Sequence, residues 1–285
     1  MLQMINNREN LYGDNISKVE QYDFSRANTS DEARTLAITT IATVCTQKFE
    51  SIGSEKLCTK LLTEAHGIPS SAYGFIPVLI KEEFLEEIDF SLTSKQRADL
   101  RIYKFGEQIS IGRETYLLTN LRALIYDVST NQLLPKKYLN FYNTDENEIA
   151  IIKKHFKVFK HKMDIRSARQ FMRHSAAVWQ ELSRRYVSGK KVPFYFYISE
   201  IWKQKGLEEQ RTQRCLEGVN LYNYAISKGI SPQDARDCLE FCTYTEIWSG
   251  WQPFALENML TERTAVGTQW ELRQTALAIK ELIND

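Results

Sequence analysis

Arginine, histidine and serine side chains are concentrated in one stretch, which runs R-Q-F-M-R-H-S-A-A-V-W-Q-E-L-S-R-R-Y from Arg169 to Tyr186. Guanidinium groups present planar forks of hydrogen-bond donors that match phosphate oxygens. A hydrogen bond to a charged group contributes about 1.5–3 kcal/mol, so two or three of them would hold a nucleotide monophosphate. The stretch therefore indicates an anion site. A solvated basic face with surface ion pairs is the alternative that composition alone favours.

The apolar residues of this stretch recur at helical spacing, which predicts a helix from Ile165 to about Tyr186 with Asp164 as its N-cap. On such a helix one flank carries four polar side chains, namely Gln170, Arg173, His174 and Glu181. Ser183 and Arg185 follow on the last turn. We therefore expect one helix to present most of the anion site.

The spacing also resembles the signature of the flavin-dependent thymidylate synthases, which is R-H-R, seven residues and S, usually followed by x-R-Y. This chain has Arg173-His174-Ser175, seven residues, Ser183 and then Arg184-Arg185-Tyr186. The acid two residues before the serine corresponds to Glu181, and the A-R-Q that precedes the motif corresponds to Ala168-Arg169-Gln170.

Two further blocks follow in the family's order. The later block of the family contains A-R-x-x-L, Y-T, an asparagine and arginine pair, and Q-W-E. Its counterparts here are Ala235-Arg236-Asp237-Cys238-Leu239, Tyr244-Thr245, Asn258 through Arg263, and Gln269-Trp270-Glu271-Leu272. A weaker block runs from Gly53 to His66-Gly-Ile-Pro69. The chain is thus identified as a divergent member of the family over about residues 40–80 and 155–285.

The resemblance implies a reaction in which NADPH reduces FAD and a one-carbon unit passes from methylenetetrahydrofolate to C5 of dUMP. It implies a homotetramer whose active sites form where subunits meet. The substrate-binding residues that it implies are Gln170, Arg173, Glu181, Ser183, Arg185, Arg236 and Arg263. Arg263 would face the uracil carbonyl and is the expected catalytic residue. The implied cofactor contacts are His66, His174, Ser175 and Asn258.

Other interpretations of single residues remain open. Glu181 could form only an i,i+4 ion pair with Arg185, and Arg236 could be an ordinary helix cation. The positions expected around the flavin depart from the family's pattern: Ser175 replaces an arginine, Gln252-Pro253-Phe254 replaces N-x-R, Gly267 replaces a histidine, Ser71 replaces a glutamate and Ile68 replaces a serine.

Three hypotheses about activity follow from this mixture of kept and altered positions. The first is a divergent thymidylate synthase with a rebuilt cofactor site. The second is a relative that acts on a different pyrimidine nucleotide or uses the flavin for other chemistry. The third is a nucleotide-binding homologue without methylation activity.

Chain length, net charge and the numbers of cysteine and histidine residues narrow the class of protein. A chain of 285 residues with a net charge of +1 argues against broad binding of nucleic acid. No apolar run approaches the roughly 20 residues of a membrane span, and the N-terminus lacks a signal-peptide pattern, so we expect a cytoplasmic protein without a membrane partner. The five cysteines form no CxxC pair and are expected to be reduced thiols. The four histidines show no metal-binding spacing, so no metal is expected.

The remaining pattern predicts one domain over residues 1–285, with a divergent N-terminal segment (1–40) and a peripheral insertion (about 90–150). Its expected fold is α/β (α+β), a mixed sheet core flanked by long helices, as the family resemblance implies. Helices are predicted for Asp31–Phe49, after Ser54, for Leu207–Lys228, from Ser231-Pro232, for Phe254–Arg263 and for Thr268–Ile283. Extended segments are predicted for Tyr73–Ile80, Lys154–Met163, Pro193–Ile198 and Glu240–Trp248.

Overall fold

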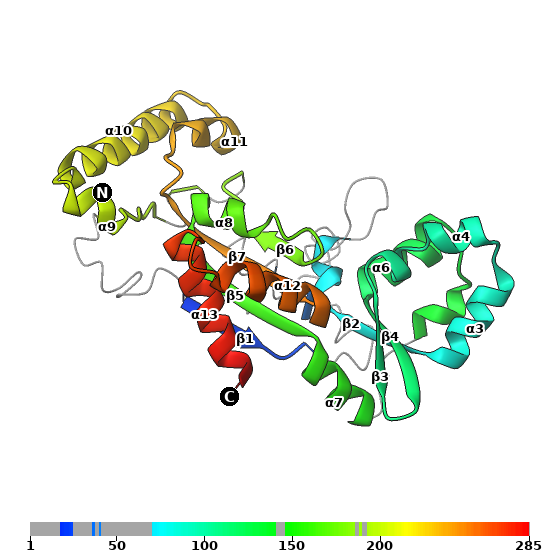
Figure 1. Ribbon diagram of the computed structural model, residues 1–285. Helices are drawn as coiled ribbons and strands as arrows, with labels where there is room; N and C mark the ends of the chain where they lie inside the picture. Colours follow the sequence, from blue (N-terminus) through cyan, green and yellow to red (C-terminus); the bar gives the residue numbers. More distant parts are fainter. Residues whose placement is uncertain are drawn as a thin grey trace.

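A computed structural model describes residues 18–24, 36–37, 40, 70–140, 146–185, 188–189 and 193–284 (Figure 1). Within these residues the chain forms two antiparallel sheets and many helices, which confirms the expected α+β class. Leu36, Ala37 and Thr40 are helical, whereas the rest of the helix predicted for Asp31–Phe49, the helix after Ser54 and His66 lie outside the described residues.

The larger sheet has four strands in the order β1-β5-β7-β6. Their bounds are Lys18–Tyr22 for β1, Lys157–Asp164 for β5, Tyr244–Trp251 for β7 and Val178–Glu181 for β6. The central pair runs from Lys157 opposite Trp251 to Asp164 opposite Tyr244. All residues of β7 except Glu246 are buried, because neighbours pair on both edges and side chains pack on both faces.

Two C-terminal helices, α12 (Pro253–Thr264) and α13 (Trp270–Asn284), lie along this sheet (Figure 1). Their inner side chains, including Met259, Leu272 and Ile279, join a core with Phe159, Phe171 and Trp251. The helices predicted for Phe254–Arg263 and Thr268–Ile283 are thereby confirmed to within two residues at each end.

The single helix predicted for Ile165–Tyr186 is wrong. Helix α8 spans only Ile165–Phe171, and the chain then turns into strand β6. The strand pairs with β7, placing Val178 opposite Gly250 and Glu181 opposite Ile247. Trp179 packs edge-on against Trp251, with ring centroids 5.2 Å apart. This sheet edge and aromatic contact outweigh helix propensity, which is a weak local preference.

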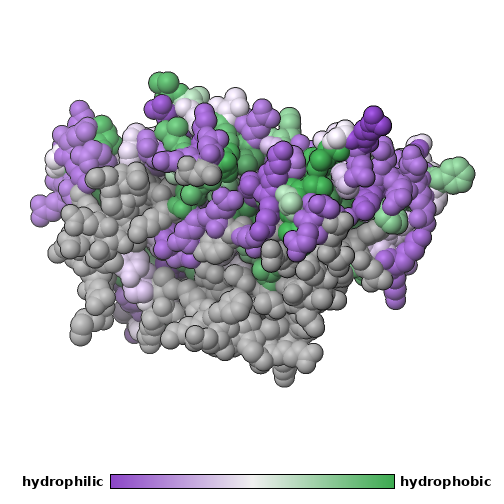
Figure 2. Space-filling view, turned by 90° about the horizontal axis from the view of Figure 1, so that it is seen from below, coloured by the Kyte–Doolittle hydropathy of each residue, from purple (hydrophilic) through white to green (hydrophobic). Residues whose placement is uncertain are grey.

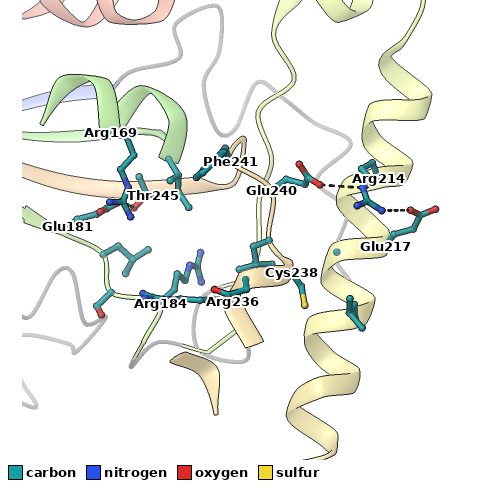
Figure 3. Close-up of a pocket in the computed structure, with 17 residues that line it drawn as sticks. Arg169, Glu181, Arg184, Arg214, Glu217, Arg236, Cys238, Glu240, Phe241 and Thr245 are labelled. Carbon is teal, nitrogen blue, oxygen red and sulfur yellow. Dashed lines mark hydrogen bonds and ion pairs between the residues drawn. The ribbon is translucent and has the colours of Figure 1, made fainter. Parts of the chain in front are cut away.

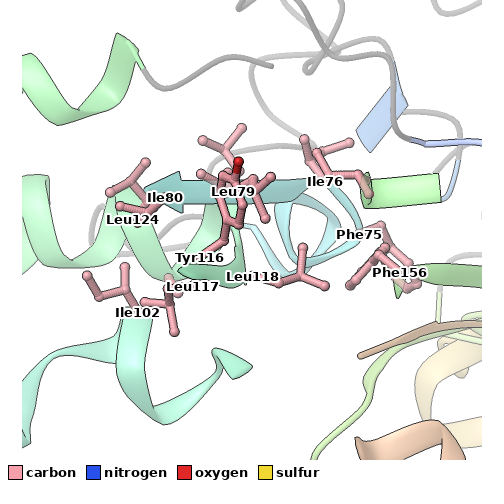
Figure 4. Close-up of a cluster of buried hydrophobic side chains, with 14 of the residues drawn as sticks. Phe75, Ile76, Leu79, Ile80, Ile102, Tyr116, Leu117, Leu118, Leu124 and Phe156 are labelled. Atoms are coloured by element: carbon pink, nitrogen blue, oxygen red, sulfur yellow. The ribbon is translucent and has the colours of Figure 1, made fainter. Parts of the chain in front are cut away.

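The second sheet has the order β2-β4-β3 and carries its own apolar core. Its strands are Pro77–Lys81 (β2), Glu107–Ile111 (β3) and Glu114–Asn120 (β4). Ile80, Leu118 and Leu124 are fully buried in this core, which also receives Phe156 from the end of α7 (Figure 4). The core is therefore continuous with the region that leads into β5.

Short elements surround this sheet. They are η4 (Ser71–Phe75), α3 (Glu82–Ser91), α4 (Ser94–Asp99), α5 (Arg101–Lys104), α6 (Leu121–Ile125), η5 (Tyr126–Thr130), η6 (Lys136–Asn140) and α7 (Glu146–His155). The strand predicted for Tyr73–Ile80 is thus partly a 3-10 turn, and the strand predicted from Lys154 begins only at Lys157.

Helices α9 (Glu200–Gln204), α10 (Glu208–Ser227) and α11 (Pro232–Ala235) lie apart from the second sheet, beside α8 (Figure 1). Ser231 occupies the N-cap of α11 and Pro232 its first turn, as predicted. The turn η7 (Arg236–Cys238) then leads toward β7, so the segment predicted as extended from Glu240 forms its strand from Tyr244. Pro193–Ile198 is extended, with one bridge from Phe196 to Thr243.

The surface of the described residues carries both hydrophilic and hydrophobic side chains. Seen from below, hydrophilic side chains cover much of the coloured area, with hydrophobic groups between them (Figure 2). Among the described helices, none combines the length and apolarity needed to cross a bilayer.

Candidate functional site

A pocket of about 960 Å³ opens between α8, the end of β6 and helix α10 (Figure 3). Three of the predicted substrate-binding residues line it, namely Glu181, Ser183 and Arg236. Further charged side chains in its wall come from elsewhere in the chain: Arg169, Arg184, Arg214, Glu217, Asp237 and Glu240. The pocket therefore brings together segments that are up to 80 residues apart in the sequence, from Ile165 to Thr245.

Glu181 lies half-buried at the end of β6, where Thr245 Oγ1 donates a hydrogen bond of 3.3 Å to its Oε1. Burial raises the pKa of the Glu181 carboxyl, and the positive charges of Arg169 and Arg236 oppose that rise. Both arginines are exposed. The arrangement places two guanidinium groups around one carboxylate, a combination that can bind an anion and accept hydrogen bonds from a neutral hydroxyl.

Arg184 and Arg214, the other two arginines that line the pocket, already have partners within the protein. Arg184 is buried, with its guanidinium carbon 4.8 Å from the centre of the Phe194 ring, and burial lowers its pKa to about 10. Arg214 pairs with Glu217 and Glu240 on either side, at 3.4 Å each (Figure 3). Because these two side chains are held by fixed partners, Arg169 and Arg236 are the better candidates for contacts with a ligand.

His174 and Arg263 form a second group, at the end of α12. The Nε of Arg263 donates a hydrogen bond of 2.8 Å to Nε2 of His174, so this nitrogen accepts and the ring is neutral. Burial and the positive charge of Arg263 both lower the pKa of His174. Asn258, on the same helix, donates to Glu262, whose carboxylate lies 3.9 Å from His174 Nε2.

The remaining predicted residues lie outside both groups or at their margins. Gln170, Arg173 and Ser175 are exposed on α8 and the turn after it. Arg185 is exposed, and its Nε donates to the side-chain oxygen of Gln233, 2.8 Å away. It is thus Arg184, its neighbour in the motif, whose side chain lines the pocket. His66 lies outside the described residues.

Within one chain, the predicted residues consequently form two separate groups. Arg236 lies in η7 beside α10, whereas Arg263 is close to the C-terminal end of α12. Sequence reasoning missed Arg169 and Arg214 as pocket residues. Arg169 stands in the A-R-Q lead-in of the motif and could have been found there, whereas Arg214 is an ordinary position of a polar helix face and carries no local signal.

The family model described as "Thymidylate synthase complementing protein" matches residues 146–285, a segment that holds both groups. Over this segment, just under half of its length, the chain is similar to that family. The flavin-dependent thymidylate synthase of Pseudothermotoga lettingae is 34% identical over 135 residues, which cover 44% of this chain and 59% of the relative. That of Aquifex aeolicus is 33% identical over 131 residues, which cover 41% of each chain.

A third relative matches a longer part of the chain at a lower sequence identity. A flavin-dependent thymidylate synthase of Thermus thermophilus is 28% identical over 225 residues, 74% of each chain. The chain thus matches about half the length of the first two relatives. Among solved structures, a UMP/dUMP methylase PolB from Streptomyces cacaoi bound with 5-Br UMP overlaps 45% of this chain and 68% of its own, at 19% identity and a TM-score of 0.41.

Two departures from the thymidylate synthase motif have a structural role in this chain. Gln252 caps the start of α12, and its side-chain amide donates to the carbonyl oxygens of Phe105 and, at 3.2 Å, Leu118. The backbone N–H of Phe254 donates to Glu107 Oε2 at 2.9 Å. These contacts fix the first turn of α12 against β3, β4 and the turn before them, at the other end of the helix from Arg263.

Proposed function

We propose that this protein is a flavin-dependent enzyme that transfers a one-carbon unit to C5 of a uracil nucleotide, with dUMP as the first candidate. One observation carries the proposal. In the segment that the thymidylate synthase family model matches, Arg169 and Arg236 flank a half-buried Glu181 in a pocket of about 960 Å³. The size and the charges of this pocket suit a nucleotide monophosphate.

In the proposed complex, Arg236 and the Ser183 hydroxyl bind the phosphate, and Arg169 adds a second guanidinium. Glu181 accepts a hydrogen bond from the sugar. Burial raises the pKa of Glu181, but a bound nucleotide leaves the carboxylate facing Arg169 and Arg236, which favour its charged form. The residues therefore orient the nucleotide without forming a covalent bond to it, which is catalysis by positioning.

Arg263 is the proposed catalytic residue. Because its Nε is held by His174, the guanidinium has a fixed direction and both Nη groups remain to face a uracil carbonyl. Positive charge placed there stabilises the negative charge that develops on the carbonyl oxygen as C5 attacks. His174 acts as a positioning residue, and its lowered pKa keeps Nε2 available as an acceptor.

His174, Ser175 and Asn258 are the described residues that we propose hold FAD. Ser175 and Asn258 are exposed and supply polar groups, and the buried His174 ring lies beside Phe171 and Trp251. This set offers hydrogen-bond donors next to aromatic rings, which fits a flavin. Bound FAD would supply the hydride of the reduction, with NADPH and methylenetetrahydrofolate as the proposed cosubstrates.

We further propose that the chain works as a homotetramer. His174 and Arg263 do not line the nucleotide pocket in one chain, and a neighbouring copy would bring the two groups into one site. A cytoplasmic location remains an expectation from the sequence.

The test uses the purified protein. We expect a flavin absorbance band and a thermal shift with dUMP that exceeds the shifts with UMP and dCMP. Arg236→Gln should weaken nucleotide binding by roughly 10- to 150-fold, because a hydrogen bond to a charged group is lost. The matched control is Arg113→Gln, an exposed arginine in the turn between β3 and β4. Equal affinity in the two variants would refute the assignment of the pocket.

The same measurements separate the alternatives. A yellow protein that is stabilised most by another pyrimidine nucleotide would indicate a changed substrate. A colourless protein that still binds a nucleotide would indicate a homologue without methylation activity. Growth of a thymidine-requiring bacterium that expresses the chain would support dUMP methylation itself.

A further inference from the structure

Two cysteines from distant segments meet beside the pocket. Cys215 lies on α10 and Cys242 lies just before β7, 27 residues later, and their sulfur atoms are 3.4 Å apart. Cys215 is 1% exposed and Cys242 is 9% exposed. A disulfide requires the sulfur atoms to approach to about 2.05 Å, so a movement of little more than 1 Å would join them.

Arg211, one turn before Cys215 on α10, distinguishes the two thiols. Its Nη2 donates to the sulfur of Cys242 at 3.3 Å, and its Nη1 bonds to Glu240 at 3.1 Å. The hydrogen bond with Cys215 and the charge of Arg211 lower the pKa of Cys242, against the effect of burial. The same hydrogen bond and burial raise the pKa of Cys215. The contact with Arg211 therefore favours negative charge on Cys242, which is also the more exposed of the two residues.

We propose that Cys242 and Cys215 form a redox-active pair that small hydroperoxides convert into a disulfide. The Cys242 thiolate attacks one peroxide oxygen, the O–O bond breaks, and the Cys242 sulfenic acid and a hydroxide or alkoxide result. The Cys215 sulfur then attacks the Cys242 sulfur and displaces hydroxide, which takes up the Cys215 proton and leaves as water. The two thiols lose two electrons in all, and the peroxide gains them.

The bond would act on the wall of the nucleotide pocket. Cys238, Glu240 and Phe241 line that wall and lie within the loop that the disulfide would close. Arg214 and Glu217 of α10, the helix that carries Cys215, also line the pocket. Oxidation would thus link α10 covalently to the segment that runs from η7 to β7. The chemistry of the pair does not depend on which ligand the pocket binds.

The test treats the purified protein with hydrogen peroxide and maps disulfides by mass spectrometry after alkylation. We expect a loss of about 2 Da, which is two hydrogen atoms, and a peptide pair linked through Cys215 and Cys242 that dithiothreitol releases. Cys238→Ser, which leaves the pair intact, should form the same link at the wild-type rate. In Cys215→Ser, dimedone should label the sulfenic acid of Cys242.

A second variant tests the role of the arginine without removing either cysteine. Arg211→Met should slow formation of the link about tenfold at neutral pH, because loss of the Arg211 charge raises the pKa of Cys242 and lowers the fraction of thiolate. The proposal is overturned if wild-type protein exposed to peroxide retains both thiols in alkylatable form. A link that joins other cysteines, or dimedone labelling of Cys215 in Cys242→Ser with none at Cys242 in Cys215→Ser, would overturn it as well.

Discussion

Arg263 donates a hydrogen bond of 2.8 Å from its Nε to Nε2 of His174, although 89 residues separate them in the sequence. The pair joins the turn after α8 to the C-terminal part of α12. It fixes the direction of the guanidinium and holds the imidazole in its neutral form. Two predicted residues, one from the R-H-S motif and one from the later block, are thus physically coupled.

This coupling predicts how the titration of His174 responds to substitution. Arg263→Gln should raise the pKa of His174, because it removes the largest of the charges that lower it, and Arg173→Gln should raise it less. NMR titration of the His174 ring protons measures both values. If Arg173→Gln raised the pKa as much as Arg263→Gln, the hydrogen bond would not be the cause.

The pocket predicts a ranking among arginines. Arg169→Gln should weaken binding of dUMP by roughly 10- to 150-fold, because an exposed guanidinium beside Glu181 is lost. Arg214→Gln should have a smaller effect, because Arg214 is already paired with Glu217 and Glu240. Isothermal titration calorimetry gives both affinities, and the reverse order would contradict the proposed site.

The fully buried His161 predicts a loss of stability in acid. Burial lowers its pKa to about 3, so the folded protein keeps the ring neutral while the unfolded chain takes up a proton below about pH 6.5. Stability from this group is complete above pH 6.5 and is lost as the pH falls toward 3. The loss between pH 7 and 5 amounts to about 2 kcal/mol.

Urea unfolding at the two pH values measures this loss, which should shrink by that amount in His161→Gln. NMR offers a check without substitution: the ring protons of His161 should show no titration between pH 8 and 5. A titration midpoint near 6.5 in the folded protein would rule out this explanation.

Gly218 predicts a steric effect at the pocket wall. A Cβ at this position would lie 2.4 Å from the carbonyl oxygen of Cys238, so α10 and η7 would have to separate. Overpacking in Gly218→Ala should therefore lower the free energy of unfolding by about 1–3 kcal/mol. Roughly 1 kcal/mol of this loss is regained, because alanine forms helices more readily than glycine. Asn220→Ala, exposed on the same helix, is the matched control and should change it by less than about 0.5 kcal/mol. Urea unfolding of both variants measures these changes. A Gly218→Ala variant more stable than the wild type would show that the contact between position 218 and Cys238 is not tight.

The sequence by itself determined the helices whose burial follows their own periodicity. Helices α10, α12 and α13 appear where the 3.6-residue pattern predicted them, and α11 starts at Ser231-Pro232 as predicted. The R-H-S and S-R-R-Y spacing also indicated the family. Residue types and their separations can be read from the sequence whether the segment folds as a helix or as a strand. Local signals were sufficient for these features.

The tertiary structure alone decided where the motif residues lie in space. Val178–Glu181 became a strand because β7 offered an open edge and Trp251 a partner for Trp179, and no local pattern contains that information. No local pattern shows that Arg184 and not Arg185 lines the pocket, or that Arg214 lies beside Glu240. Nor does any local pattern show that the sulfur atoms of Cys215 and Cys242 meet. Each depends on contacts between distant segments, whose geometry exists only once the sheet and α10 have packed.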